Sequence, residues 1–228
     1  MSKKASKKGS LWKKAVITIG AIGIVAGSAT VAKRVIDPGE RVIEVIDGDT
    51  FTISNKQSIR LYNIDAPELQ YCFGKEAKKA LTDKILGKKV ILKSPRMDYY
   101  KRVQAYVYIV DGKTLEGESI NEYMVKNGFA KEHADNTPES NIISKSDIFA
   151  RENKLGIFSS ECTPLVPTKV GCTIKGQVSY DTNERIYITP DCEDQYNPAI
   201  VERYRGEDWF CTEKEAKEAG FIKSPNCQ

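Results

Sequence analysis

The chain has 228 residues, of which 40% are hydrophobic and 29% are charged. This composition is ordinary for a soluble protein, and the length allows one medium domain plus smaller additions. The net charge of +4 originates at the N-terminus, since residues 1–34 hold eight basic residues and no acidic residue. The remainder has 27 basic against 31 acidic residues. These numbers exclude a general basic surface, so any polyanion must be bound by local charge.

The N-terminal segment is predicted to export the chain. A lysine-rich start precedes an uncharged run, Ala15 to Ala32, that is rich in small residues. This order is typical of a signal peptide, whereas the length of the run also fits a retained membrane anchor. The basic residues lie mostly before the run. We therefore expect residues 37–228 outside the cytoplasm, either secreted or anchored to the membrane through residues 1–36.

The cysteines agree with export. There are six, an even number: Cys72, Cys162, Cys172, Cys192, Cys211 and Cys227. No two have the C-x-x-C spacing of a zinc site, and the only histidine is His133. We therefore expect disulfides formed outside the cytoplasm rather than structural zinc.

Strand and helix patterns follow a turn at residues 37–39. Runs rich in Val, Ile, Phe and Thr predict strands, and Asp47-Gly48 between the first two is a hairpin signal. Apolar residues at helical spacing, each run ending near a glycine, predict three helices. The expected strands are 41–46, 50–54, 58–63, 90–93 and 103–110, and the expected helices are 74–86, 119–126 and 138–154. The predicted fold class is α+β, mainly β, with a five-stranded OB-fold barrel and three helices.

The C-terminal part is predicted to be a small module of its own. Residues 164–169 contain two prolines and are expected to be a linker between a domain at 37–163 and the module at 170–228. The module is too short to form a stabilising hydrophobic core without cross-links, so we expect its four cysteines to form disulfides. Three pairings are possible for four cysteines, and the sequence does not choose among them.

Acidic and arginine residues that could carry chemistry lie in four short stretches. Asp49 and Asp65 come from separate turns, and two such carboxylates make a hard oxygen site suited to Ca²⁺. Arg60 and Arg102 offer planar forks that bind phosphate oxygens and stabilise charge during phosphoryl transfer. Glu68 could orient or deprotonate an attacking water. Each residue alone also fits an ordinary turn or a solvated side chain, so the hypothesis depends on their combination.

The order and spacing of three motifs resemble the staphylococcal nuclease family. These motifs are I-D-G-D-T, R-L-Y-N-I-D-A-P-E and D-Y-Y-K-R-V-Q-A-Y-V-Y, and the resemblance covers roughly residues 40–160. It implies an OB barrel that binds calcium and a nucleotide on one side. Asp49 and Asp65 would be the calcium ligands, and Ala66 stands where a backbone carbonyl contributes.

The same resemblance assigns roles around the phosphate. Arg60 and Arg102 would bind it, Glu68 would be the proposed general base, and Tyr100 falls where a tyrosine contacts the terminal phosphate. Tyr99 replaces a lysine of the family pattern.

Resemblance also bears on the cysteines and on the C-terminal residues. Exported members of the family often have cysteines at the places of Cys72 and Cys162, which implies a bridge that closes a loop of about 90 residues. Residues 170–228 are similar to a small module often appended to exported bacterial nucleases of this type. Ile188 stands where that module usually has histidine, which weakens any metal role.

We expect a calcium-dependent, sugar-nonspecific nuclease that hydrolyses DNA and RNA and leaves 3′-phosphate ends. No obligate protein partner is inferred, and the membrane is a partner only if the leader is retained. Two alternatives remain: an OB module that binds nucleic acid without cutting, and a structural component of the cell envelope. The presence of both arginines and all three carboxylates favours the enzyme over the binding module.

Overall fold

The computed structural model describes residues 39–110, 119–133 and 137–227. Contacts divide the chain into two units, residues 1–36 and 37–228. The predicted leader of residues 1–36 lies outside the described residues. Within the part of the chain that the structure describes, none of the helices combines the length and the apolar character needed to cross a bilayer.

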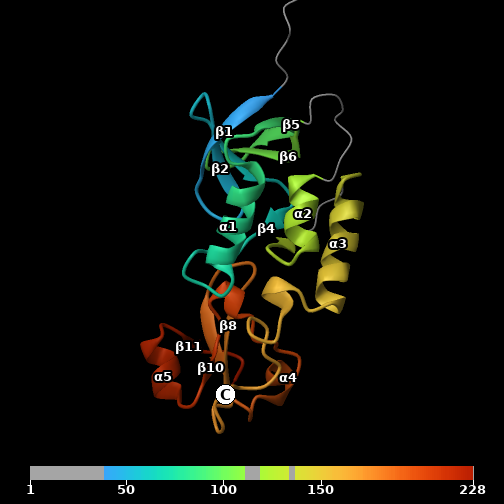
Figure 1. The fold of residues 1–228 in the computed structure, drawn as a ribbon. Coiled ribbons are helices and arrows are strands. Elements are labelled where there is room, and N and C mark those ends of the chain that lie inside the picture. Colours follow the sequence, from blue (N-terminus) through green and yellow to red (C-terminus); the bar gives the residue numbers. More distant parts are fainter. Residues whose placement is uncertain (1–38, 111–118, 134–136, 228) are drawn as a thin grey trace, which may run out of the picture. The chain divides into compact units, whose positions relative to one another are not determined.

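Five strands form a barrel, most of which is labelled in Figure 1. They pair in the order β1-β2-β3-β6-β5, and β5 pairs back onto β1, so that the sheet rejoins itself. Only β3 and β6 run parallel among these pairs. The strands are β1 (Glu40–Val45), β2 (Thr50–Ile53), β3 (Ser58–Leu61), β5 (Lys89–Met97) and β6 (Val103–Ile109). All five strands predicted from the sequence are therefore present.

Alternating side chains fill the barrel. In β2 and β3 the inward residues include Phe51, Ile53, Ile59 and Leu61, each at most 1% exposed. Successive side chains of a strand point to opposite faces, so Arg60, between Ile59 and Leu61, points out of the core. Burial of each large apolar side chain stabilises the fold by about 1.5–3 kcal/mol. The barrel core thus determines which face of β3 carries the arginine.

One strand is longer than its sequence pattern indicates. The prediction ended at Lys93, whereas β5 continues past Pro95 to Met97. The register between β5 and β6 shifts between Lys93 and Arg96. Proline has no N–H for the ladder and is tolerated at such an irregularity.

The three predicted helices are α1 (Gly74–Ile85), α2 (Ile120–Lys126) and α3 (Ser140–Glu152). Leu81 and Ile85 of α1 are fully buried in the barrel core. Ser119 caps α2 by accepting a hydrogen bond from the backbone N–H of Glu122. Two short strands were not predicted, β4 (Ile64–Asp65) and β7 (Lys131–Glu132), which pair antiparallel. A single helical turn, η1 (Gly156–Phe158), follows α3.

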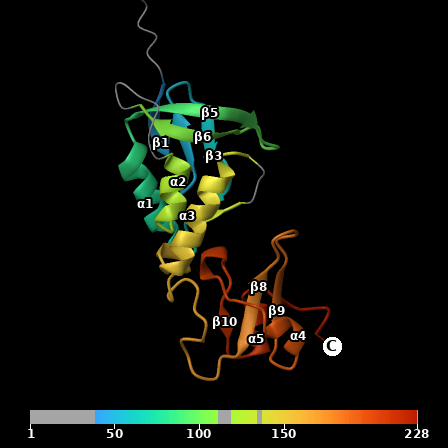
Figure 2. The same ribbon diagram turned by 90° about the vertical axis from the view of Figure 1, so that its right-hand side faces the viewer.

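The C-terminal residues form a second sheet, of which β8, β9 and β10 are labelled in Figure 2. Its four strands pair in the order β10-β8-β9-β11. Ile174, Tyr187, Ala216 and Phe221 form its small core. Its elements are β8 (Ile174–Val178), β9 (Arg185–Ile188), α4 (Glu193–Tyr196), η2 (Arg203–Arg205), β10 (Trp209–Phe210), α5 (Glu213–Glu218) and β11 (Ile222–Lys223).

Three disulfides cross-link the chain. Cys72 is joined to Cys162, the pairing that the family resemblance implies. Of the three possibilities left open for the other four cysteines, the structure has Cys172 with Cys211 and Cys192 with Cys227.

The predicted domain boundary is bridged by apolar contacts. Ile157, Phe158 and Cys162 pack with Tyr204 of the C-terminal part in one buried cluster. The backbone N–H of Arg203 donates to the carbonyl of Cys162 at 2.8 Å. Residues 37–228 are one unit by their contacts, so the separate module at 170–228 stays a prediction.

Candidate active site

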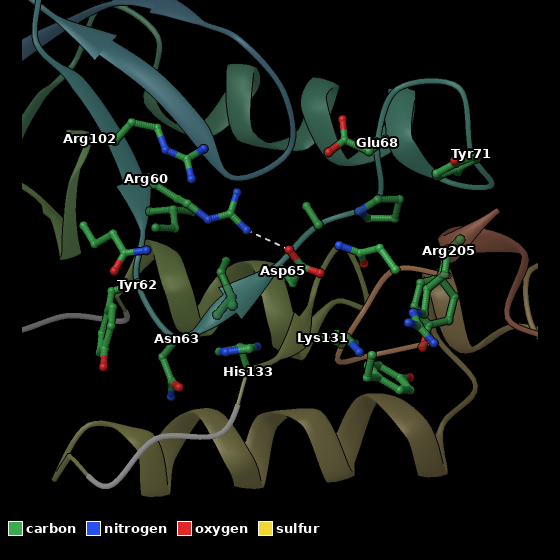
Figure 3. Close-up of a pocket in the computed structure, with 18 of the residues that line it drawn as sticks. Arg60, Tyr62, Asn63, Asp65, Glu68, Tyr71, Arg102, Lys131, His133 and Arg205 are labelled. Carbon is green, nitrogen blue, oxygen red and sulfur yellow. Dashed lines mark hydrogen bonds and ion pairs between the residues drawn. The ribbon is translucent and has the colours of Figure 1, made fainter. Parts of the chain in front are cut away.

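A pocket of about 770 Å³ lies where β3, β4, β7 and the start of β6 meet the C-terminal residues (Figure 3). Its lining includes Arg60, Asp65, Glu68, Tyr100 and Arg102. Residues predicted from three of the four stretches of sequence therefore surround one cavity. Asp49 lies behind this lining and reaches it through Arg60.

Asp49 is fixed by the turn between β1 and β2. The side chain of Asp47 accepts hydrogen bonds from the backbone N–H groups of Asp49 and Thr50 at 3.0 and 2.8 Å. The carboxylate of Asp49 is 3% exposed and accepts hydrogen bonds from the Thr50 hydroxyl and the Ala66 backbone N–H, both at 2.9 Å. It is therefore a preorganised acceptor rather than a solvated turn residue.

Arg60 links the two predicted metal ligands. Its Nη1 lies 2.5 Å from Oδ1 of Asp49. Its Nη2 lies 2.7 Å from Oδ1 of Asp65, the contact drawn as a dashed line in Figure 3. Burial acts to lower the pKa of Arg60, but the charges of Asp49 and Asp65 outweigh it and raise the pKa. The guanidinium is consequently charged and oriented toward the pocket edge.

The positive charge of Arg60 does not fully compensate the negative charges of Asp49 and Asp65. Burial raises the pKa of Asp49 to about 7, although the Arg60 charge acts in the opposite direction. The charges of Asp47 and Asp65 raise that pKa further, and the hydrogen bond from Ala66 lowers it. A second positive charge beside Asp49 would stabilise its ionised form.

The donor set fits calcium. Asp49, Asp65 and the carbonyl of Ala66 would supply oxygen ligands only, which Ca²⁺ prefers. The side chain of Asp65 is 53% exposed, so it is open to an arriving ion. Among the described residues there is no cluster of three or more Asp, Glu, His or Cys side chains that could hold a metal. Carbonyl groups and water would have to complete the coordination.

Arg102 is held in the turn between β5 and β6 by Asp98, a residue that the sequence analysis did not single out. Oδ2 of Asp98 accepts from Nε of Arg102, and Oδ1 accepts from its backbone N–H, both at 2.8 Å. Burial acts to raise the pKa of Asp98, but the bonds and charge of Arg102 keep it below its usual value. Because the anchor uses Nε, both Nη groups remain for a phosphate.

Tyr99 and Tyr100 lie at the tip of the same turn. Their side chains are 93% and 75% exposed. The Tyr100 ring centroid is 5.3 Å from Cζ of Arg102. Tyr100 therefore lies beside the arginine with which the resemblance groups it.

Glu68 lies in the loop between β4 and α1, exposed and on the lining of the pocket. Its carbonyl accepts from the backbone N–H of Tyr71 at 2.9 Å. Gly74 approaches the same carbonyl so closely that a Cβ there would lie 2.1 Å from the oxygen. Together with the Cys72–Cys162 bridge, these contacts hold the loop that presents Glu68.

The pocket also has residues that sequence reasoning missed. Lys131 in β7 and Tyr180 and Arg205 of the C-terminal part line it. The Tyr180 ring centroid lies 3.9 Å from Nζ of Lys131 and 3.4 Å from Cζ of Arg205. These residues are far apart in the chain and belong to no motif, so only the folded structure brings them together.

The site therefore combines an OB-type barrel with two arginines and adjacent carboxylates at one pocket. The sequence profile described as "Staphylococcal nuclease homologue" matches residues 58–160. An Escherichia coli protein named "Uncharacterized endonuclease" is 31% identical over 132 residues, which are 56% of this chain and 80% of that protein. The chain belongs to the staphylococcal nuclease family.

Two further relatives agree. A Shigella flexneri protein named "Micrococcal nuclease" is 31% identical over 125 residues, 52% of this chain and 72% of the relative. A Haemophilus influenzae protein named "Uncharacterized endonuclease" is 39% identical over 94 residues, 40% of this chain. The match spans about half of that relative, 49% of its length. The family and the names of these relatives together support the assignment of this chain to the hydrolases, as a nuclease.

Proposed function

We propose that the protein is a calcium-dependent, sugar-nonspecific nuclease that hydrolyses phosphodiester bonds of DNA and RNA and leaves 3′-phosphate ends. The observation that carries this proposal is the convergence of Arg60 and Arg102 on one pocket, with Asp49 and Asp65 around the first arginine. A cluster that only stabilised the barrel would not need a second arginine anchored through Nε and open at both Nη groups.

The two arginines would bind the scissile phosphate. A guanidinium forms paired hydrogen bonds with phosphate oxygens, and its charge stabilises the negative charge that develops as the nucleophile adds. Arg102 is held by Asp98 through Nε, so it need not be reorganised when the substrate binds. Both Nη groups of Arg60 contact Asp49 and Asp65, so Arg60 would exchange part of these contacts for the phosphate. Tyr100, beside Arg102, would contact the terminal phosphate.

Glu68 would orient or deprotonate the attacking water. Water oxygen forms the new bond to phosphorus, the bond from phosphorus to the 5′-oxygen breaks, and that oxygen takes up a proton. A 5′-hydroxyl and a 3′-phosphate result. A carboxylate that is exposed at the pocket edge has access to such a water.

Asp49, Asp65 and the Ala66 carbonyl would hold Ca²⁺. When bound, the ion would supply positive charge that polarises the phosphate. Ca²⁺ accepts irregular oxygen sites of this kind more readily than Mg²⁺ does.

We further propose that the protein works outside the cytoplasm. Its three disulfides fit an oxidising compartment. Residues 1–36 would take it there, either as a cleaved signal or as a retained anchor.

The test is digestion of plasmid DNA and of RNA by the purified protein in Ca²⁺, in Mg²⁺ and in excess EDTA. We expect EDTA to abolish cleavage and Ca²⁺ to restore it better than Mg²⁺. The product ends should accept label from a 5′-kinase without prior phosphatase treatment. Full cleavage in EDTA would contradict the metal assignment, and binding of nucleic acid with no cleavage in any metal would indicate a binding module instead.

A further inference from the structure

Lys131 is a buried lysine in the wall of the pocket. It is 9% exposed and lies opposite Asp65 in the β4–β7 ladder. Among the described residues its ammonium group has no ion pair and no hydrogen-bond acceptor, and its contact is the ring of Tyr180 at 3.9 Å. A charge that is removed from water without an anionic partner is costly. The charges of Glu202 and Asp65 act on Lys131 without forming an ion pair with it, so its ammonium group has no directly bound anion among the described residues.

Lys175 shows how the same chain satisfies a buried lysine that has a structural role. It is 8% exposed, close to the value for Lys131. Its Nζ donates to the carbonyls of Tyr196 and Ala199, both at 2.7 Å. Lys131 has no such acceptors among the described residues, so a structural role of the kind that Lys175 has does not account for a buried lysine at this position.

The C-terminal residues hold Lys131 at the pocket. Tyr180 packs against its ammonium group, and Arg205 lies against the same ring. Arg205 is itself paired with Glu207 at 3.1 Å and Glu202 at 3.5 Å. Of these two cations, Lys131 is therefore the one available to an incoming anion. Figure 3 shows Arg102 and Arg205 toward opposite ends of the drawn pocket, with Lys131 nearer to Arg205.

We propose that Lys131 binds a second phosphate of the substrate strand, next to the phosphate held by Arg60 and Arg102, and that Tyr180 and Arg205 position it. The inference depends on the proposed nuclease function and extends it. The substrate is a polynucleotide strand that contacts both the barrel and the C-terminal wall of the pocket, rather than an isolated phosphodiester. The C-terminal wall consists of the lining residues Val178, Tyr180, Asn183, Tyr204 and Arg205. This gives residues 174–207 a role in substrate binding. Lysine suits it, because an ammonium group is a compact point charge for a phosphate.

The test compares two substrates and two variants of the full protein. The substrates are a dinucleoside monophosphate, which has only the scissile phosphate, and a short single-stranded oligothymidylate. The variants are Lys131→Met, which keeps the shape of the side chain and removes its charge, and Lys145→Met. Lys145 is exposed on α3 outside the pocket, so it provides the matched change in charge.

For the oligothymidylate we expect Lys131→Met to raise KM about tenfold, as for loss of one charge-assisted contact. The salt dependence of log KM should fall in slope by roughly 0.7, the value for one phosphate of a single strand. For the dinucleoside monophosphate both variants should match the wild type. Equal effects on both substrates, or no difference between the variants, would overturn the inference while leaving the nuclease assignment intact.

A second charge change tests the C-terminal wall directly. Asn183 is exposed and lines the pocket, so Asn183→Asp adds a negative charge there without removing a core contact. We expect it to raise KM for the oligothymidylate, whereas Asn226→Asp, exposed and away from the pocket, should not. Equal KM values for these two variants would show that the strand does not reach this wall.

Equilibrium binding separates the two hypotheses if the wild type cleaves neither substrate. A labelled oligothymidylate is titrated with the wild type, Lys131→Met and Lys145→Met in EDTA. Weaker binding by Lys131→Met alone would retain the phosphate subsite and reject the nuclease. Equal binding by all three proteins would reject the subsite as well.

Discussion

Replacement of Arg102 by lysine tests the assignment of the phosphate-binding arginines. Lysine keeps the charge but loses the planar guanidinium with its paired N–H donors. It also loses the Nε–H group that donates a hydrogen bond to Asp98 at 2.8 Å. The backbone N–H of residue 102 still donates to Asp98, and the side chain of Arg102 is 32% exposed. The free energy of unfolding should therefore fall by only about 1 kcal/mol.

The effect on turnover should be much larger than the effect on folding. Removal of one preorganised donor from an anion site lowers kcat by about a hundredfold or more, which corresponds to about 2.7 kcal/mol of transition-state stabilisation. We expect kcat of Arg102→Lys on single-stranded DNA in Ca²⁺ to fall by at least that factor. Thermal unfolding of the same preparation would give the loss of stability.

Arg151 provides a matched control. Its Nε donates to the carboxylate of Asp147, four residues earlier, at 2.5 Å, which reproduces the Arg102–Asp98 arrangement outside the pocket. Arg151→Lys should lose a similar amount of stability and almost no turnover. If Arg102→Lys keeps as much turnover as Arg151→Lys, Arg102 does not stabilise the transition state and the assignment is wrong.

Two further predictions concern the loop between β4 and α1. Glu68→Gln should lower kcat by a factor of roughly 10²–10⁴ if the carboxylate acts on the attacking water. The melting temperature should not change, because the side chain is exposed. Equal turnover of the variant and the wild type would remove Glu68 from the mechanism. The double variant Cys72→Ser/Cys162→Ser should lose about 4 kcal/mol of unfolding free energy in a denaturant titration, since the bridge closes a loop of some 90 residues, and an unchanged midpoint would show that the bridge contributes nothing to stability.

The barrel strands and the outward direction of Arg60 were predictable because both depend on local patterns. Alternation around Arg60 predicts a strand and the outward direction of the arginine, and the motif residues lie in turns next to strands. The end of β5 was not predictable from propensity. Pro95 interrupts the pattern, while long pairing with β6 carries the strand past it.

The rest of the site depends on contacts between distant residues. Asp98 is recognisable only once the turn has placed it against Arg102. Lys131 acquires its position from a two-residue pairing with β4, too short for any periodic signal. Tyr180 belongs to a segment that shares no motif with the barrel. No local rule of sequence connects these residues, since their proximity is produced by tertiary packing.

The parallel pairing of β3 with β6 has a consequence for folding. Arg60 is in register with Gln104, so the ladder that joins these strands also sets Arg60 beside the turn that carries Arg102. A slip of one residue would turn Arg60 into the barrel and expose Ile59. Parallel pairs between distant segments are slow to form, because loop-closure entropy opposes them. Recovery of catalytic turnover during refolding would therefore report this late pairing, whereas helix-sensitive circular dichroism would also report earlier, local events.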